Sequence, residues 1–243
     1  MGLFSKEKKL GKNKVNKMSK EKKYAVVIGA TGNLGSAIVN ALEKEGYEVE
    51  DLWKGPNHPD ATKAESYLKL PSRIDMAVYV AGINLVKPIS EITEKEWDSV
   101  IDVNLRGAFL FAKHAYNGLK NAKGVFVTIS SMNAGFPYPN RSAYTTSKAA
   151  LEGLTKQLAV EWGNDGISTH SIRLGPLNKL MKTTKANPLI LEATKKRILQ
   201  HELIPPEAVA SYIVWLGQGG AKWVTGAVID FDGGFTLNAY PLL

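Results

Sequence analysis

Residues 24–35 read YAVVIGATGNLG, a short apolar run rich in β-branched residues that is followed by a glycine-rich turn. The apolar residues 24–28 predict a buried strand, and residues 36–45 after the turn predict a helix. Glycines let a backbone approach a ligand closely, and the amide groups at the start of a helix attract phosphate. A glycine-rich turn between a strand and a helix therefore predicts a dinucleotide site on a parallel α/β sheet.

The run 47–53 predicts a second strand, and its end bears on the choice of cofactor. An acidic residue at that point normally holds the adenosine ribose and excludes a 2′-phosphate. Trp53 and Lys54 stand there instead, which favours NADP over NAD, although Asp51 could serve if the strand is shorter. The following segment 54–59 is too short for the usual crossover helix, so we expect a helix to be missing on one flank of the sheet.

Tyr144 and Lys148 lie four residues apart in a segment, 143–154, with the apolar spacing of a helix, so they share one face. A nearby ammonium group favours the phenolate and lowers the pKa of a Tyr. Such a Tyr can act as an acid or a base near neutral pH. The pair alone is a weak signal, but Ser131 stands thirteen residues upstream, just after the apolar run 124–129 that predicts a buried strand.

Ser131, Tyr144 and Lys148 at this spacing, with Val103-Asn104-Leu105 upstream, resemble the short-chain dehydrogenase/reductase family across nearly all of 24–236. The resemblance implies an α/β fold with a single Rossmann-type, doubly wound parallel sheet and helices on both faces. It implies hydride transfer between NADP or NAD and a small-molecule carbonyl/alcohol pair. It also implies that Asn104, Ser131, Tyr144 and Lys148 form the catalytic set.

The resemblance further implies a set of cofactor contacts along the carboxyl ends of the strands. These are Gly29, Thr31, Asn33, Leu34, Gly35, Trp53, Lys54, Asp60, Ala81, Gly82, Tyr144, Lys148, Gly175 and Leu177.

Four further positions depart from the family pattern. Asn33 stands where the middle glycine of the turn is usual, and the spacing of the glycines recurs in the larger branch that modifies nucleotide sugars. Tyr79 and Val80 replace a pair of Asn before Ala81, which predicts the loss of a polar tie near the central strand. Lys179 stands where Thr commonly bonds the cofactor, so that contact is in doubt.

Two further segments frame the expected site. Thr93 and Glu96 form a capping box that starts a helix, and Asn104 lies on the apolar stripe of that helix, where it needs buried partners. The loop 132–143 follows Ser131 and offers Phe136, Tyr138 and Arg141 as candidate substrate contacts.

Residues 178–206 correspond to the mobile substrate lid of the family and are rich in Lys and Arg. We favour the interpretation that these charges lie on a helix face exposed to solvent. The alternative is that they bind an acidic group of the substrate beneath the lid.

The composition narrows the remaining choices. A chain of 243 residues with 44% hydrophobic content suits one domain, which we assign to 24–243. The chain has no Cys, which excludes a disulfide framework and a cysteine metal site and suits the cytoplasm; we expect no metal. No apolar run reaches the length of a membrane span.

The formal charge of +8 is concentrated in residues 1–23, which hold nine Lys and two Glu. We interpret this segment as a flexible Lys-rich arm, because it has too little apolar surface to offset the entropy of ordering. The rest of the chain is close to neutral, so we expect no nucleic-acid partner.

Helices predicted at 94–120 and 144–162 carry more apolar positions than one sheet face can cover. In the family these helices pair between subunits, which implies a homodimer or homotetramer. Two alternatives to carbonyl reduction remain: modification of a nucleotide-linked sugar or carrier-linked acyl group, and a non-catalytic member that only binds dinucleotide.

Overall fold

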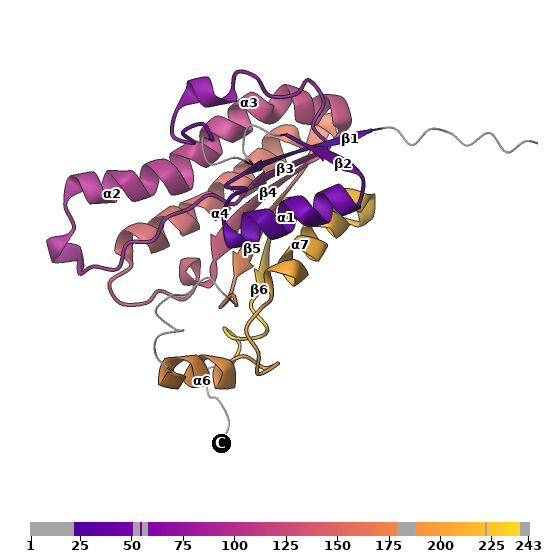
Figure 1. Ribbon diagram of the computed structural model, residues 1–243. Helices are drawn as coiled ribbons and strands as arrows, with labels where there is room; N and C mark the ends of the chain where they lie inside the picture. The colour runs from indigo at the N-terminus through magenta and orange to yellow at the C-terminus, as the bar shows by residue number, and fades with distance from the viewer. Residues whose placement is uncertain (1–21, 51–53, 55–57, 179–187, 222, 239–243) are drawn as a thin grey trace, which may run out of the picture.

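The computed structural model describes residues 22–50, 54, 58–178, 188–221 and 223–238. In this part of the chain, six parallel strands form one sheet in the order β2-β1-β3-β4-β5-β6 (Figure 1). The strands are β1 (Lys23–Ile28), β2 (Tyr47–Val49), β3 (Met76–Tyr79), β4 (Val125–Ser131), β5 (Ser168–Leu174) and β6 (Ala227–Phe231). The strand order reverses between β1 and β3, so the predicted doubly wound α/β fold is confirmed.

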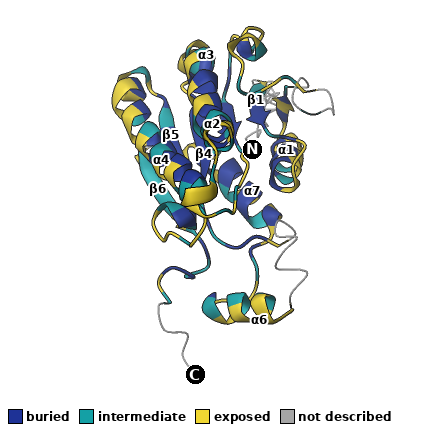
Figure 2. Cartoon of the chain, turned by 90° about the vertical axis from the view of Figure 1, so that its left-hand side faces the viewer, coloured by how far each residue is buried: buried dark blue, intermediate teal, exposed yellow. Residues whose placement is uncertain are grey.

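Helices cover both faces of the sheet (Figures 1 and 2). On one face, α1 (Asn33–Lys44) packs against α7 (Pro206–Trp215). On the other face lie α3 (Gly107–Ala122) and α4 (Ser142–Trp162). The helix α2 (Glu94–Ile101) runs into α3 through a π-helical turn, η4 (Asp102–Arg106), and α6 (Pro188–Arg197) stands apart from both layers. The short turns are η2 (Ala64–Tyr67), η3 (Ile89–Glu91), η5 (Met132–Ala134), η6 (Gly163–Asp165) and η7 (Leu216–Gly220).

The core lies between the central strands and the helices on either side. Every residue of β3 and β4 is buried, because these strands are covered on both faces. On the α3 and α4 side, the ring of Phe111 lies 6.3 Å from that of Tyr79 and 5.7 Å from that of Phe126. This packing holds the carboxyl ends of the strands in a fixed arrangement, and the candidate site is built on those ends.

The crossover from β2 to β3 lacks the usual helix, as the sequence predicts. Within the described residues 58–75, the only helical element is the single turn η2. Its Tyr67 is 1% exposed and packs on Phe111 with ring centroids 5.8 Å apart, while its hydroxyl donates to the carbonyl of Ala61 at 2.8 Å. One buried Tyr therefore covers the flank of the sheet that a helix would otherwise cover.

The second strand is shorter than the sequence predicts. It ends at Val49 rather than at residue 53, and its three residues pair with residues 23–25 of β1. The backbone amide of Glu50 makes one more bond, to the carbonyl of Ala25 at 2.9 Å. Trp53, Asp51, Lys179 and residues 1–21 of the predicted arm lie outside the described residues. No helix in the described part of the chain is both long and apolar enough to cross a membrane.

Candidate active site

Two glycines allow the turn between β1 and α1 to pack closely, both within itself and against the residues that follow β3. Gly29 has a φ of +93°, and a Cβ placed on it would lie 2.6 Å from the backbone nitrogen of Ala81. A Cβ on Gly35 would overlap the carbonyl oxygen of Gly29. These close approaches explain why both positions require glycine.

The start of α1 suits a pyrophosphate. Its first turn contains no acidic residue, and its N-cap, Gly32, supplies no side chain to cap the helix. The amide groups and the positive end of the helix dipole therefore remain available to an anion. Thr31 and Asn33 are exposed beside this helix start, whereas Leu34 is 4% exposed and packs into the core.

Two predicted contacts on the adenosine side have partners within the chain. The carboxylate of Asp60 accepts hydrogen bonds from the backbone and the hydroxyl of Thr62, both at 2.8 Å. These bonds hold the pKa of Asp60 below its usual value. The ammonium group of Lys54 lies 2.8 Å from the carboxylate of Glu43 on α1.

Asn104 is fully buried in η4 and makes three hydrogen bonds. Its Oδ1 accepts from the amide of Ile83 at 2.8 Å, and its Nδ2 donates to the carbonyl of Ile83 at 2.9 Å. The same Nδ2 donates to Ser147 Oγ, also at 2.9 Å. The prediction that Asn104 needs buried partners is confirmed, and Ser147 is a partner that the sequence did not reveal.

Gly82 is the point where β3, η4 and α4 meet. A Cβ on Gly82 would lie 3.3 Å from Asn104 Oδ1 and 3.3 Å from Lys148 Nζ. Lys148 is 4% exposed, and its ammonium group donates to the carbonyl of Ile129 at 2.7 Å. Three predicted site residues from three separate elements therefore converge on one small volume.

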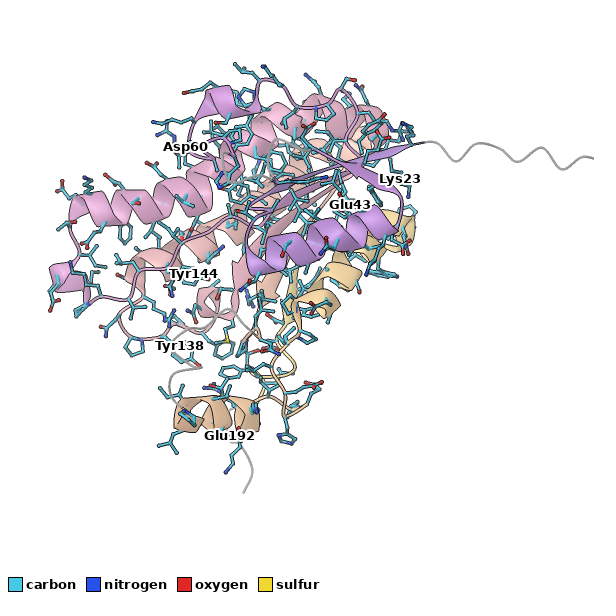
Figure 3. All side chains as sticks on the ribbon, viewed as in Figure 1. Lys23, Glu43, Asp60, Tyr138, Tyr144 and Glu192 are labelled. Atoms are coloured by element: carbon cyan, nitrogen blue, oxygen red, sulfur yellow. The ribbon has the colours of Figure 1, made fainter. Side chains whose placement is uncertain are left out.

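Tyr144 and Ser131 form the other half of the site. Ser131 is the last residue of β4 and accepts a hydrogen bond from the amide of Asn133 at 3.2 Å. The Ser131 side chain also lies near enough to the hydroxyl of Tyr144, on the first turn of α4, to lower the pKa of that Tyr. Figure 3 shows Tyr144 facing the loop that carries Tyr138, between the sheet and α6.

The pKa values of Tyr144 and Lys148 differ from what the sequence predicts for this pair. Burial raises the pKa of Tyr144, while the neighbouring side chain of Ser131 and the charge of Arg141 act in the opposite direction. Burial also lowers the pKa of Lys148 to about 8. Its ammonium group lies 5.8 Å from the centre of the Tyr144 ring and is turned to the carbonyl of Ile129. The prediction that Lys148 lowers the pKa of Tyr144 is therefore wrong for the chain by itself.

The remaining predicted residues lie at the ends of β5 and β4. Gly175 packs tightly on Asp232, since a Cβ there would lie 2.6 Å from Asp232 Cα, and Leu177 is 4% exposed. In the loop after Ser131, Phe136 is 45% exposed, Tyr138 contacts α6, and Arg141 directly precedes α4.

Tyr79 corrects a further expectation. The sequence predicts that replacing Asn at this position removes a polar tie. Instead, the Tyr79 hydroxyl donates to the carbonyl of Val103, the residue before Asn104. The Tyr side chain is long enough to extend from β3 to η4, and its hydrogen bond replaces the one that was expected to be lost.

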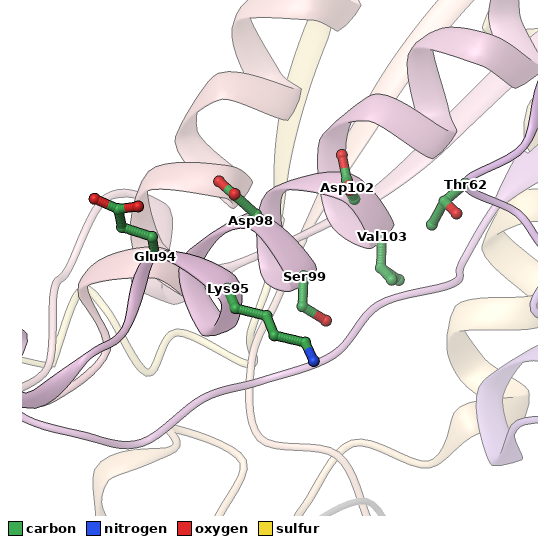
Figure 4. Close-up of a pocket in the computed structure, with 7 residues that line it drawn as sticks. All are labelled: Thr62, Glu94, Lys95, Asp98, Ser99, Asp102 and Val103. Atoms are coloured by element: carbon green, nitrogen blue, oxygen red, sulfur yellow. The ribbon is translucent and has the colours of Figure 1, made fainter.

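A cavity of about 510 Å³ lies outside this group, between α2 and the loop at Thr62 (Figure 4). Its lining consists of Thr62, Glu94, Lys95, Asp98, Ser99, Asp102 and Val103. None of these is a predicted site residue. Its three carboxylates would repel a phosphate, so the cavity does not suit a dinucleotide.

A buried ion pair supports the site from behind. Arg173 on β5 binds the carboxylate of Glu152 on α4 through two nitrogens, at 2.9 and 2.7 Å. Ser130 donates to the same carboxylate at 2.8 Å. None of these residues was predicted. The available signal was Glu152 four residues after Lys148, on the helix face that meets the sheet.

Comparisons with known proteins identify the family. A family model described as "Enoyl-(Acyl carrier protein) reductase" matches residues 60–236. The chain belongs to the short-chain dehydrogenase/reductase family.

Individual members of the short-chain dehydrogenase/reductase family resemble the chain over most of its length. A "3beta-hydroxysteroid dehydrogenase 1" of Eggerthella lenta is 36% identical over 171 residues, which cover 69% of this chain and 65% of that relative. A "3beta-hydroxysteroid dehydrogenase" of Mediterraneibacter gnavus is 30% identical, with 93% of this chain and 91% of the relative covered. The crystal structure of gox2181 has a TM-score of 0.80 at 25% identity and covers 89% of this chain and 96% of that chain. This short-chain dehydrogenase/reductase is accordingly an NAD(P)-dependent oxidoreductase.

The buried Lys148 should make the stability of this dehydrogenase/reductase depend on pH. Its pKa is about 8 in the folded chain against an ordinary value of 10.5, so the unfolded chain binds more protons between these two pH values. Stability contributed by this group therefore rises with pH through that window and is lost below it. The difference in unfolding free energy between the wild type and Lys148→Met should change by up to about 3 kcal/mol across the window. Urea unfolding at several pH values measures it, and a constant difference would contradict the expectation.

Proposed function

We propose that Tyr144 transfers the proton to or from the substrate oxygen in reversible carbonyl reduction, with Ser131 hydrogen-bonded to the same oxygen. The observation that carries this proposal is that Ser131, at the carboxyl end of β4, lies near enough to Tyr144 for its side chain to lower the pKa of that Tyr. Two neighbouring hydroxyl groups can bind a single oxygen and stabilise the charge that develops on it.

Lys148 and Asn104 support that proton transfer. The Lys148 ammonium group lies beside Gly82 and donates to the carbonyl of Ile129, and we propose that it holds the nicotinamide ribose. Asn104 holds Ser147, whose hydroxyl also donates to the carbonyl of Tyr144 at 2.7 Å, and so steadies the first turn of α4. A bound nicotinamide cofactor supplies or accepts the hydride.

The residues suited to hold that cofactor are the predicted ones at the carboxyl edge. Gly29 and Gly35 allow close approach, and the first turn of α1 suits the pyrophosphate. Gly82 borders Asn104 and Lys148, which suits the nicotinamide ribose.

An absorbance assay of NADPH consumption tests the function directly. The panel contains aliphatic ketones, keto acids, a 3-ketosteroid and a β-ketoacyl thioester. The steroid reflects the names of the two bacterial relatives, and the thioester reflects the carrier-linked acyl alternative, which the description of the family model favours. Turnover of any member supports the oxidoreductase. NADPH binding with no turnover across a wide panel would favour the non-catalytic alternative.

We propose a preference for NADP over NAD, because Lys54 is a cation beside the expected adenosine ribose. Its ammonium group pairs with Glu43 at 2.8 Å, and the pair is partly exposed, so a 2′-phosphate could compete for it. Lys54→Glu should narrow or reverse the ratio of NADPH to NADH affinity. Glu43→Gln is the matched variant and should widen it. Titration calorimetry measures both ratios, and equal affinities in all three proteins would reject the preference.

We propose that this protein assembles as a homodimer or homotetramer through α3 and α4. Apolar side chains on their outer faces support this, since Phe109 is 49% exposed and Val160 is 79% exposed. Light scattering at micromolar concentration should give a multiple of the 26.5 kDa chain mass. Phe109→Asp should shift the mass towards that of the monomer, whereas a monomeric wild type would contradict the proposal.

We further propose that residues 24–243 form the catalytic unit, that 178–206 form the substrate lid, and that the protein works in the cytoplasm. The absence of Cys supports the location.

A further inference from the structure

The last turn of α6 carries an arginine, Arg197, that has no anionic partner among the residues that the structure describes. Arg197 stacks its guanidinium group on the ring of Phe235, with 4.3 Å from Cζ to the ring centre. Phe235 itself is 5% exposed, so this ring is a fixed platform after β6. Stacking on an aromatic face fixes the plane of a guanidinium and leaves its edge open to a planar anion.

The backbone around Arg197 is tied to the segment that follows β6. Asn238 donates to the carbonyl of Arg197 at 3.1 Å, and the amide of Leu199 donates to the carbonyl of Gly233 at 3.0 Å. The arginine is thus fixed from both its backbone and its side chain. A preorganised guanidinium loses little freedom when it binds a ligand.

The donors of this guanidinium are largely unused. Nη1 reaches the hydroxyl of Tyr138 at the long distance of 3.4 Å, and Nε is buried without a hydrogen-bond partner. Within the described part of the chain, no carboxylate forms an ion pair with Arg197. A half-buried charge without a partner costs free energy, and a bound oxyanion would offset that cost.

The contact between Arg197 and Tyr138 brings these guanidinium donors next to a loop of the proposed active site. Tyr138 belongs to the loop that joins Ser131 to Tyr144. Figure 3 shows Tyr138 between Tyr144 and the helix α6, which carries Glu192 on its far side. An anion bound between Arg197 and Tyr138 would therefore lie against the loop that leads from Ser131 to the proposed proton donor.

We propose that Arg197 and Tyr138 form an oxyanion site for a carboxylate or phosphate group carried by the substrate, at a distance from the carbonyl that reacts. The proposal rests on the proposed function of Tyr144 and Ser131 and names the substrate class for it: ketones, or the matching alcohols, that bear an anionic group. The fork of Arg197 binds two oxygens of the anion, and the Tyr138 hydroxyl donates to one of them.

Matched pairs of substrates test this site. Levulinate is compared with methyl levulinate, and dihydroxyacetone phosphate with dihydroxyacetone; the two pairs distinguish a carboxylate from a phosphate. In the wild type, kcat/KM should favour the anionic member of at least one pair. Arg197→Met should lower that ratio by at least about tenfold, as loss of a charged hydrogen-bonded contact predicts. Arg197→Lys, which keeps the charge without the fork, should lower it less.

Lys196→Met is the matched control, because it removes the same charge from an exposed position on the same helix. It should leave the ratio unchanged. Equal ratios in the wild type and Arg197→Met, or an equal loss in the Lys196 variant, would overturn the site.

Thermal unfolding with the same four compounds separates this inference from the proposed function. If the wild type turns over no ketone, the proposed reaction fails. The oxyanion site still stands only if the anionic compounds raise the melting temperature of the wild type and not of Arg197→Met.

Discussion

Replacing Tyr144 by phenylalanine is expected to lower kcat by about 10²–10⁴-fold, the range that a positioned general acid or base contributes. The change removes one hydroxyl and keeps the ring, so the packing of a side chain that is largely buried should survive. The hydroxyl is the group that lies near Ser131, and its loss leaves the substrate oxygen without the proposed proton donor. Steady-state turnover on the best substrate of the NADPH assay measures the effect.

Two comparisons make this expectation specific to the site. Binding of NADPH to Tyr144→Phe should remain within a few-fold of the wild type, since the hydroxyl is proposed to act on the substrate. Tyr212→Phe removes a hydroxyl from α7, on the opposite face of the sheet, and should keep normal turnover. Near-wild-type turnover by the Tyr144 variant would show that another group transfers the proton.

The sequence predicted the fold because its signals are local and repeat along the chain. The glycine turn at 29–35, the capping box at Thr93 and the apolar strand runs each determine a short piece of backbone. Together they leave few arrangements of a parallel sheet. Even the missing crossover helix could be predicted, because the segment 54–59 is too short to contain one.

Predictions from the sequence were wrong where the predicted property depended on distances between helices and strands. The pKa of Tyr144 is set by burial and by the direction in which Lys148 points, and neither follows from a spacing of four residues. Tyr79 was expected only to remove a tie, since its reach to the carbonyl of Val103 depends on how β3 lies against η4. The end of β2 depended on pairing with β1.

The pair of Glu152 and Arg173 was missed for the same reason. An arginine inside an apolar strand and a glutamate inside a helix become meaningful only when the two elements pack together. Once packed, they link three parts of the site: Ser130 donates to Glu152 and lies 3.3 Å from the carbonyl of Lys148, while Arg173 reaches Asp230 on β6 at 3.1 Å. The pair ties the helix that carries Tyr144 and Lys148 to β5, and Ser130 ties the same glutamate to β4, the strand that carries Ser131.

Replacing Arg173 by methionine should lower the free energy of unfolding by about 3–5 kcal/mol, the cost of leaving a buried carboxylate without its partner. Glu152 is 7% exposed, so water cannot take the place of the two lost bonds. The double variant Glu152→Met with Arg173→Met should lose less than Arg173→Met alone, because two apolar side chains can share the space that the ion pair fills. Urea unfolding followed by tryptophan fluorescence measures all three proteins.

An exposed ion pair provides the matched control for this prediction. Arg106 and Asp102 lie 3.7 Å apart on the surface, with side chains 62% and 42% exposed, so Arg106→Met should cost no more than about 1 kcal/mol. Similar losses for the two arginine variants would mean that burial does not set the cost. If the double variant folds as stably as the wild type yet turns over more slowly, the pair serves mainly to fix the position of α4 against β5 and so the position of Lys148 relative to Ser131. If its stability and its turnover are both normal, the pair is dispensable, and the packing of α4 on the sheet alone positions the site.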